Sequence, residues 1–398
     1  MRRTDVACAA LACVLAGNQT AAQEVRRSAH HDYRAITVAD GLDTPWSIAW
    51  LPDGDMLVTE RPGRLRIVRD GTLLPDPVPG VPEVVARGQG GLFDVLPHPD
   101  FAANRLLYLS YARPTGEGST TAVVRGRFED DRLSDVVDVF EAQSRGGGHY
   151  GGRLTWDADG YLFATVGDRM ARTRGDLAAH PAQDPSNHQG VTVRLHDDGR
   201  VPADNPFVGQ PGALPEIWSY GHRNPQGLLV HPETGDLWAH EHGPQGGDEL
   251  NLIRPGLNYG WPVVGYGVNY GSGTAIHAGT RGDGMESPVH FWVPSIATSG
   301  LMVYTGDRFP DWRGSFFVGG MAGRQLARLT PSVDRPGRIE LEETLAYGIG
   351  RVRDVRQGPD GYIYLAVEQR DQPSQVVRLE PVARRRVDEQ DERRAPPP

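Results

Sequence analysis

Residues 157–166 read DADGYLFATV, a short Asp–Gly turn followed by a run of β-branched and aromatic residues. Asp and Gly supply the positive φ angle that a tight hairpin needs, and the apolar run that follows favours a strand. The same phrase, a turn rich in Pro, Asp and Gly before an apolar run, recurs five more times. The further copies are residues 52–59 (PDGDMLVT), 98–110 (HPDFAANRLLYLS), 231–239 (HPETGDLWA), 309–318 (FPDWRGSFFV) and 358–367 (GPDGYIYLAV).

This repeat predicts an all-β fold. Six copies at uneven intervals averaging about 60 residues predict six four-stranded antiparallel blades around an axis, a six-bladed β-propeller. The 50 glycines and 32 prolines agree with many turns, and no long amphipathic helical pattern competes. A pair of irregular β-sandwiches remains the structural alternative. Residues 170–205 and 260–285 are predicted to be long loops, which in a propeller gather at one end of the channel and carry binding sites.

The ends of the chain differ from the repeat region. Residues 1–22 combine Arg2 and Arg3, an apolar run and small residues, the pattern of a secretory signal peptide, so we predict a periplasmic protein. Both cysteines lie in that segment, which leaves the mature protein without disulfides. Residues 383–398 have too few apolar side chains to pack and predict a disordered tail. Residues 23–382 are then the propeller and catalytic domain.

Composition restricts the partners. The formal net charge of −10 argues against nucleic acid, and no later stretch is apolar enough to span a membrane. All 41 basic residues are arginine, so Schiff-base chemistry on lysine is excluded. The sequence favours a monomer without deciding against a dimer.

Residues 218–262 hold the densest set of chemically useful side chains. The guanidinium of Arg223 and the amide of Asn224 can bind anionic or carbonyl oxygens. Residues 243–249, GPQGGDE, offer carbonyls and carboxylates close together, the ligands that a hard cation such as calcium requires. The two features suggest an anionic organic cofactor with a divalent metal. A glycine-rich surface loop beside a structural arginine would explain the same local pattern, and the local chemistry leaves both interpretations open.

A series of phrases along the chain resembles, in its order, the soluble pyrroloquinoline quinone (PQQ)-dependent aldose sugar dehydrogenases of the glucose/sorbosone dehydrogenase family. The resemblance runs from about Leu42 to Arg378 and implies a six-bladed propeller with PQQ and calcium at the channel mouth, oxidising aldoses at C1. The phrases are TPWSIAWLPDGDMLVTERPGRLRIV (44–68), RGQGGLFDVLPHPDF (87–101), HYGGRLTWDADGYLFATVGD (149–168), YGHRNPQGL (220–228), HGPQGGDELNLI (242–253), NYGWP (258–262) and RVRDVRQGPDGYIY (351–364).

The resemblance implies three catalytic residues. His149 takes the place of the base that removes the proton of the sugar's C1 hydroxyl, and histidine has a pKa near the working range. Asp168 matches the carboxylate that orients this histidine. Arg223 lies where it can stabilise the oxyanion that develops on the cofactor.

The resemblance also implies binding residues. Those matched to the cofactor are Gln89, Arg223, Asn224, Tyr270, Arg351 and Arg353. Those matched to metal are Gly243 and Pro244, through their carbonyls, for the calcium on the cofactor, and Glu249 and Tyr259 for a second, structural calcium.

One position departs from the family pattern. Family members usually carry a cofactor-binding lysine where this chain has Ala322. Arg324, two residues further along the same loop, is the candidate replacement. Without it, the affinity for the cofactor or its orientation is in question.

Two rival functions remain at this stage. A calcium-dependent propeller hydrolase such as a lactonase would also use carboxylates and a histidine, but it would not explain the arginine pair or Gln89. A non-catalytic ligand-binding propeller would keep the blades and lose the pair of His149 and Asp168. NAD is excluded as acceptor because no strand–GxGxxG–helix unit is evident. The preferred aldose and the physiological electron acceptor are left open.

Overall fold

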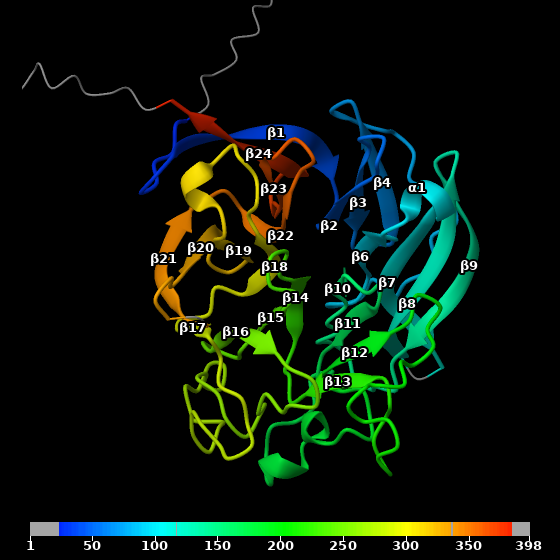
Figure 1. The fold of residues 1–398 in the computed structure, drawn as a ribbon, viewed down its shortest axis with the longest axis vertical. Coiled ribbons are helices and arrows are strands. Elements are labelled where there is room, and N and C mark those ends of the chain that lie inside the picture. Colours follow the sequence, from blue (N-terminus) through cyan, green and yellow to red (C-terminus); the bar gives the residue numbers. More distant parts are fainter. Residues whose placement is uncertain (1–23, 117, 336, 384–398) are drawn as a thin grey trace, which may run out of the picture.

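A computed structural model describes residues 24–116, 118–335 and 337–383. It contains six four-stranded antiparallel sheets around a central axis, which confirms the predicted six-bladed β-propeller (Figure 1). The predicted signal peptide and the predicted tail beyond Ala383 lie outside the described residues. Among the described residues, no helix has the length and apolar character that crossing a membrane requires.

Each blade starts at the axis and ends at the rim. The strands of the first three blades are β2 (Pro45–Trp50), β3 (Met56–Glu60), β4 (Arg64–Arg69) and β5 (Thr72–Leu73); β6 (Leu92–Pro97), β7 (Leu106–Thr115), β8 (Gly118–Glu129) and β9 (Arg132–Glu141); and β10 (Leu154–Trp156), β11 (Leu162–Val166), β12 (Val191–Leu195) and β13 (Ile217–Tyr220). The next two blades consist of β14 (Pro225–Val230), β15 (Leu237–Glu241), β16 (Asp248–Ile253) and β17 (His290–Trp292); and β18 (Thr298–Val303), β19 (Phe316–Gly320), β20 (Gln325–Pro331) and β21 (Ile339–Leu345).

The two ends of the described chain meet in the sixth blade. Its strand order is β1 (Asp32–Leu42), β24 (Ser374–Val382), β23 (Ile363–Glu368) and β22 (Arg351–Gln357). The N-terminal strand β1 is the outer strand and pairs antiparallel with β24, with Asp32 opposite Val382. This pairing closes the ring, because the last blade takes one strand from the start of the chain and three from its end.

All six copies of the turn phrase lie at the same place, between the first and second strands of a blade. In the copy at 157–166, the backbone N–H groups of Asp159 and Tyr161 donate to Asp157 Oδ1, and Gly160 has a φ of 82°. The Asx turn and the positive φ explain why Asp and Gly recur there. Among the described residues, helical structure is confined to one short helix and three 3₁₀ turns, which are α1 (Phe101–Asn104), η1 (Leu177–Ala179), η2 (Pro181–Gln183) and η3 (Pro310–Trp312).

One predicted loop is partly wrong. Residues 170–205 include the buried strand β12 together with η1 and η2, so the long loop ends at Val191. The strand was missed because its short alternating run, VTVRL, lies between segments rich in Asp, Pro and Asn. The segment 260–285 has the predicted irregular structure, held by isolated bridges such as Val264 to Gly279.

The centre of the propeller is polar and buried. Arg153 Nη1 lies 3.2 Å from Asp354 Oδ1 and 3.5 Å from Asp94 Oδ1, and all three side chains are buried. Arg356 Nε lies 2.9 Å from Asp354 Oδ2. These ion pairs join three blades, and removal of one partner would leave an uncompensated buried charge. The guanidinium of Arg153 also lies 4.1 Å from the ring centre of Trp46, which fixes that indole at the edge of the site described below.

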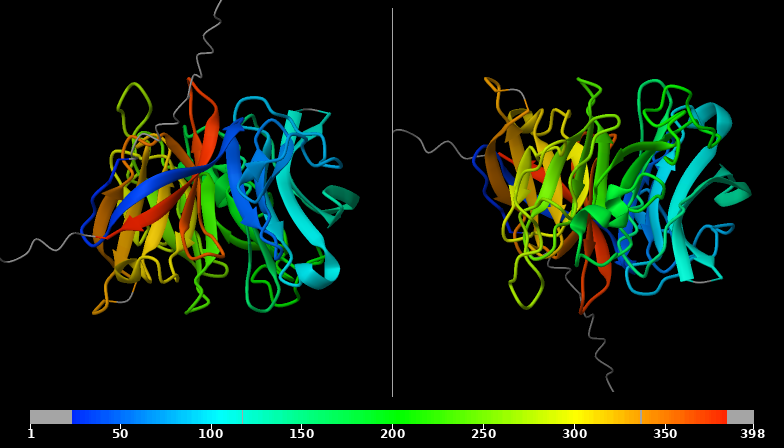
Figure 2. Two further views of the ribbon diagram at one scale, coloured as in Figure 1. Left: turned by 90° about the horizontal axis from the view of Figure 1, so that it is seen from above. Right: turned by 90° about the horizontal axis from the view of Figure 1, so that it is seen from below.

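Loops project from both ends of the sheets when the propeller is seen from the side (Figure 2). In an antiparallel blade, the loops that lead into the innermost strand lie at the same end as those between its second and third strands. Gln89, His149 and Arg223 lie on loops of the first kind, and Asp168 and Gly243 on loops of the second kind. The topology therefore collects the predicted site residues at one end of the propeller.

Candidate functional site

The centre of the site is the contact between His149 and Asp168. His149 lies on the loop that leads into β10, and Asp168 follows β11, the next strand of the same blade. His149 Nδ1 lies 2.6 Å from Asp168 Oδ1, and both side chains are buried. A Cβ atom at Gly167 would lie 2.3 Å from the His149 carbonyl oxygen, so only glycine at this position permits so close an approach.

The surroundings decide the proton positions in this pair. Burial, more than any other factor, lowers the pKa of His149; Arg223 and Arg169 lower it further, and Asp168 opposes the shift. Burial would raise the pKa of Asp168, but the hydrogen bond from His149 and the nearby charges outweigh it and lower that pKa. The pair is therefore a neutral imidazole that donates its Nδ1–H to a carboxylate. His149 Nε2 then carries the lone pair and can accept a proton.

The backbone at His149 is constrained from two sides. Its φ is 43°, a left-handed conformation that costs energy for a residue other than glycine, and its N–H donates to Gln89 Oε1 at 2.7 Å. The buried guanidinium of Arg169 donates to the carbonyls of Gly146, at 2.8 Å, and Gly148, at 2.7 Å, and lies 3.6 Å from the ring centre of Tyr150. Arg169 thus holds the glycine loop that carries the histidine.

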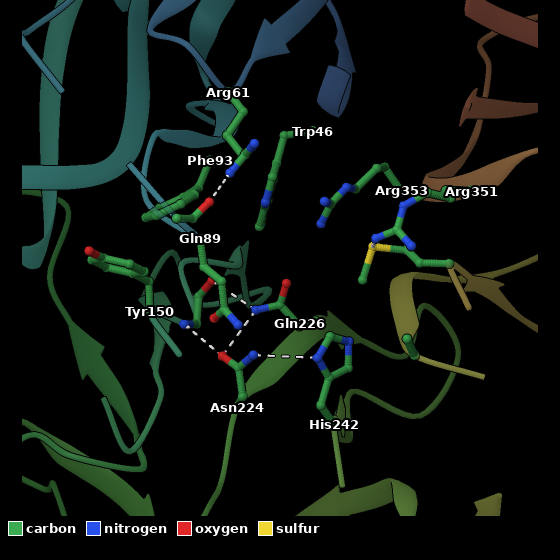
Figure 3. A pocket seen from close by; sticks show the side chains of 14 residues that line it. Trp46, Arg61, Gln89, Phe93, Tyr150, Asn224, Gln226, His242, Arg351 and Arg353 are labelled. Carbon is green, nitrogen blue, oxygen red and sulfur yellow. Dashed lines mark hydrogen bonds between the residues drawn. The ribbon is translucent and has the colours of Figure 1, made fainter. Parts of the chain in front are cut away.

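A cavity of about 330 Å³ lies beside this loop, and we call it the arginine cavity (Figure 3). Three guanidinium groups, three aromatic rings and several amides or imidazoles face it, the polar and aromatic lining of a small-molecule site. The lining residues are Trp46, Arg61, Gly88, Gln89, Phe93, Tyr150, Gly151, Asn224, Gln226, His242, Ala297, Met321, Arg351 and Arg353.

The charge of the arginine cavity is only partly compensated. Arg351 Nε lies 3.2 Å from Glu368 Oε1, and Arg353 Nε lies 2.7 Å from Glu368 Oε2. One carboxylate therefore serves two guanidinium groups, and Arg61 adds a third positive charge. Burial lowers the pKa of both Arg351 and Arg353, a cost that an anion in the cavity would offset. The cavity suits an anionic ligand.

A smaller cavity of about 20 Å³, which we call the carboxylate cavity, has room for one ion or one water. Gly243, Pro244, Glu249 and Tyr259, which the sequence assigned to two metal sites, all line this one cavity together with Glu241. Arg223 also lines it and donates from Nη1 to the carbonyls of His242, at 3.1 Å, and Gly243, at 2.7 Å.

The two glutamates make the carboxylate cavity attractive for a cation. Glu241 and Glu249 are direct partners across strands β15 and β16, a placement of like charges that destabilises a sheet. Burial and then the charge of Glu241 raise the pKa of Glu249 well above its ordinary value. Among the described residues no cluster of three His, Cys, Asp or Glu forms a metal site. The donors here are two carboxylates and backbone carbonyls, the oxygen set that calcium accepts.

Four predicted cofactor residues do not line the arginine cavity, and one of them, Arg223, lines the carboxylate cavity instead. Tyr270 is 68% exposed, and among the described residues the lining of the two cavities does not include it. Ala322 and Arg324 line a neighbouring cavity of about 560 Å³, which shares Met321 and Arg351 with the arginine cavity. Arg324 therefore lines a cavity that adjoins the arginine cavity, but it does not line the arginine cavity itself.

The sequence analysis missed several residues of the site. Trp46 and Arg61 belong to the phrase at 44–68, which contributed to the family resemblance without a role for either residue. His242 begins the phrase at 242–253 and received no role in the sequence analysis, yet it lines both cavities; its Nε2 is 2.7 Å from the Thr298 carbonyl oxygen. Glu241 and Glu368 have no motif of their own, since strand register alone places them opposite Glu249 and Arg351.

Comparison with known proteins identifies the family of this chain. The model of the glucose/sorbosone dehydrogenase family matches residues 42–378. The aldose sugar dehydrogenase YliI of Escherichia coli is 43% identical over 342 residues, which cover 83% of this chain and 88% of that protein. The chain therefore belongs to the glucose/sorbosone dehydrogenase family and is a sugar dehydrogenase of the oxidoreductase class.

Solved structures are also similar. The apo form of the soluble aldose sugar dehydrogenase of Escherichia coli has a TM-score of 0.80 and 39% identity, covering 88% of this chain and all of the other. The PQQ-bound aldose sugar dehydrogenase of Streptomyces coelicolor has a TM-score of 0.71 and 28% identity, covering 90% of this chain and 98% of the other.

Proposed function

We propose that this protein is a PQQ- and calcium-dependent aldose sugar dehydrogenase that oxidises the sugar at C1 to the lactone, with His149 as the general base. The observation that carries the proposal is the link between the pair of His149 and Asp168 and the arginine cavity. Gln89 lines that cavity and accepts the backbone N–H of His149 at 2.7 Å, so the base stands at the edge of a site built for an anion.

The residues present fit both groups. PQQ carries three carboxylates, and the arginine cavity offers Arg61, Arg351 and Arg353, of which two share one glutamate. Trp46 is among the aromatic rings that would face a planar ligand there. The mutually repelling Glu241 and Glu249, with the carbonyls of Gly243 and Pro244, would hold calcium in the carboxylate cavity. Tyr259 lines the same cavity, which has room for one ion, so the second, structural calcium that the resemblance assigned to Glu249 and Tyr259 would be this same ion.

The chain's own residues would carry out the proton chemistry. PQQ, when bound, supplies the hydride acceptor, and calcium polarises its carbonyl as a Lewis acid. His149 Nε2 takes the proton of the C1 hydroxyl as the C1 hydrogen leaves, which yields the lactone. Asp168 holds the Nδ1–H and favours the imidazolium that forms. Arg223 keeps a positive charge at the Gly243 carbonyl, where it can stabilise developing negative charge.

The decisive experiment is reconstitution. Purified protein would be incubated with PQQ and calcium, and reduction of an artificial dye would be followed with a panel of aldoses. We expect activity with aldoses that depends on both PQQ and calcium and is absent with NAD as acceptor. Hydrolysis of lactones without dye reduction would instead favour the hydrolase. Binding of a sugar without either reaction would favour a non-catalytic propeller.

We further propose that the protein is exported by residues 1–22 to the periplasm, that it works as a monomer, and that a separate acceptor reoxidises the cofactor. Sequencing the N-terminus of protein recovered from a periplasmic fraction tests the cleavage. A start upstream of residue 23 would contradict it. Sedimentation of the same sample gives the oligomeric state.

A further inference from the structure

The indole of Trp261 contacts the same carboxylate as His149. Trp261 Nε1 lies 2.7 Å from Asp168 Oδ2, although 93 residues separate the two in the sequence. Trp261 is buried, at 7% exposure, and Asp168 is buried more completely. The NYGWP phrase was read above as part of a family resemblance, and this contact gives its tryptophan a physical role.

The two oxygens of Asp168 have separate donors. Oδ1 accepts from His149 Nδ1 at 2.6 Å and from the backbone N–H of Met170 at 2.9 Å. Oδ2 accepts from Trp261. His180 also faces this carboxylate, but its Nε2 is 4.0 Å from Oδ2, beyond hydrogen-bond distance. His180 Nδ1 accepts from the backbone of Ala182, and its Nε2 has no hydrogen-bond partner among the described residues.

Trp261 is itself held firmly. Its backbone N–H donates to the Gly221 carbonyl at 2.8 Å, and its carbonyl accepts from Gln183 Nε2 at 2.7 Å. The guanidinium of Arg223 lies 5.1 Å from the centre of the indole ring, and the ring lines the carboxylate cavity. The indole therefore joins the carboxylate of Asp168 to the wall of the proposed metal site through a side chain with little freedom.

We propose that Trp261 is a positioning residue for the pair of His149 and Asp168: its indole N–H fixes Asp168 Oδ2, so that Oδ1 stays directed at the Nδ1–H of the base. This inference rests on the proposed function for its kinetic consequence. The hydrogen-bond geometry itself can be tested in the protein without cofactor.

Loss of the N–H has a defined effect on the pair. A buried carboxylate oxygen without a donor holds a proton more tightly, and the carboxylate then attracts the proton on His149 more strongly. His149 and Asp168 titrate together, so the proton that the pair must lose before His149 can act as a base is retained to higher pH. Arg223 and Arg169 also face the pair, and His180 Nε2 lies 4.0 Å from Asp168 Oδ2. Phenylalanine keeps an aromatic ring beside the Arg223 guanidinium, so the lost N–H is the main change at position 261. The acidic limb of the kcat/KM profile should therefore move to higher pH.

The test uses Trp261→Phe, which removes the N–H and keeps an aromatic ring. Trp292→Phe is the matched control, because Trp292 is also buried and donates its indole N–H, at 2.8 Å, to a carboxylate other than Asp168, Glu342 Oε1. In cofactor-free protein, the downfield proton resonance of the His149 Nδ1–H would be recorded and assigned by its loss in His149→Gln. With PQQ and calcium added, kcat and KM would be measured against pH.

We expect the resonance to shift in Trp261→Phe and to stay in place in Trp292→Phe. We also expect kcat to fall about ten- to a hundredfold, the factor for one lost hydrogen bond to a charged group, with KM changed much less. An unshifted resonance in Trp261→Phe would overturn the inference. Inactivity of the wild type would refute the proposed function and leave the resonance test valid.

A second measurement covers the case in which Trp261→Phe does not fold. The indole ¹H–¹⁵N signal of Trp261 can be followed in the wild-type chain and in His149→Gln, where the partner of Asp168 changes and the indole does not. A shift of that signal, with the Trp292 signal constant, supports the shared carboxylate. Identical signals in both proteins would contradict it.

Discussion

The Nδ1 atom of His149 lies 2.6 Å from Oδ1 of Asp168, and the two residues are only 19 positions apart in the sequence, at the two sides of one β-hairpin. Both stand at the same end of the third blade, and Asp168 is almost completely buried. A buried carboxylate that holds one nitrogen of a neutral imidazole leaves the other nitrogen free for proton transfer, and the first two predictions follow from that relationship.

Replacing His149 with Gln should lower kcat by about 10²–10⁴, the scale for loss of a general base, while PQQ still binds. Glutamine keeps a polar side chain at the site but has no basic nitrogen. Dye-linked turnover gives kcat, and titration of the cofactor into apoprotein gives its dissociation constant. Turnover within a few-fold of the wild type would remove His149 from the reaction.

Asp168→Asn should move the acidic limb of the pH profile to lower pH and reduce turnover. Burial already lowers the pKa of His149, so the wild-type limb should lie below about pH 6.5. The Asp168 carboxylate opposes that shift, and its removal lets the pKa fall further. Because the base must be neutral, activity then persists to lower pH, although the amide no longer holds the reactive tautomer. A limb that moves to higher pH would contradict the assigned hydrogen bond between His149 and the Asp168 carboxylate. The direction is opposite to that expected for Trp261→Phe.

The blades could be predicted because their signal is local. The turn at Asp157 to Gly160 specifies its hairpin through its own side chain and one positive φ. A positive φ recurs in the copies of the other five blades, at Gly54, Arg105, Gly235, Gly314 and Gly361. Closure of the ring could not be predicted in this way. The pairing of β1 with β24 joins opposite ends of the chain. Neither strand has a residue pattern that identifies the other as its partner.

The same distinction between local sequence signals and long-range contacts applies to the residues of the site. His149 and Arg351 lie in phrases that resemble a family, so the sequence was enough to single them out. Glu368 and Glu241 acquire their roles from strand register, which places them opposite Arg351 and Glu249, and no short pattern encodes register over such a distance. Trp261 was visible in a motif, but its contact with Asp168 depends on how two loops from different blades meet.

Calcium should stabilise the wild-type protein strongly against unfolding, and it should stabilise the Glu249→Gln variant much less. In the absence of metal, Glu241 and Glu249 face each other across two strands, and their repulsion opposes folding. The neutral amide should therefore raise the free energy of unfolding of the calcium-free protein by about 1 kcal/mol. Thermal unfolding with and without calcium measures both effects, and the exposed Glu340→Gln is the control. An equal calcium-induced rise of Tm in Glu249→Gln and the wild type would place the ion elsewhere.

The last prediction concerns the family lysine that Ala322 replaces. Arg324 lies on the same loop, and the cavity it lines shares Arg351 with the arginine cavity, so a cofactor carboxylate at that boundary would be within the reach of a long side chain. A desolvated carboxylate without its cation costs about 2–5 kcal/mol, and some residue must offset that cost. We expect Arg324→Ala to weaken PQQ binding at least tenfold. A tenfold loss of affinity is smaller than the full cost of a desolvated carboxylate without its cation. Ala322→Lys in the same background should partly restore the binding.

The competing explanation is that Arg351 and Arg353 suffice for the cofactor and that Arg324 only faces solvent. Titration of apoprotein with PQQ at fixed calcium separates the two, with Arg335→Ala as the control for loss of an exposed arginine on the same blade. A dissociation constant that is unchanged in Arg324→Ala would leave the cofactor to Arg351 and Arg353 alone. Arg353→Ala should then cause the larger loss, because that side chain is the more deeply buried of the two and its Nε lies 2.7 Å from Glu368.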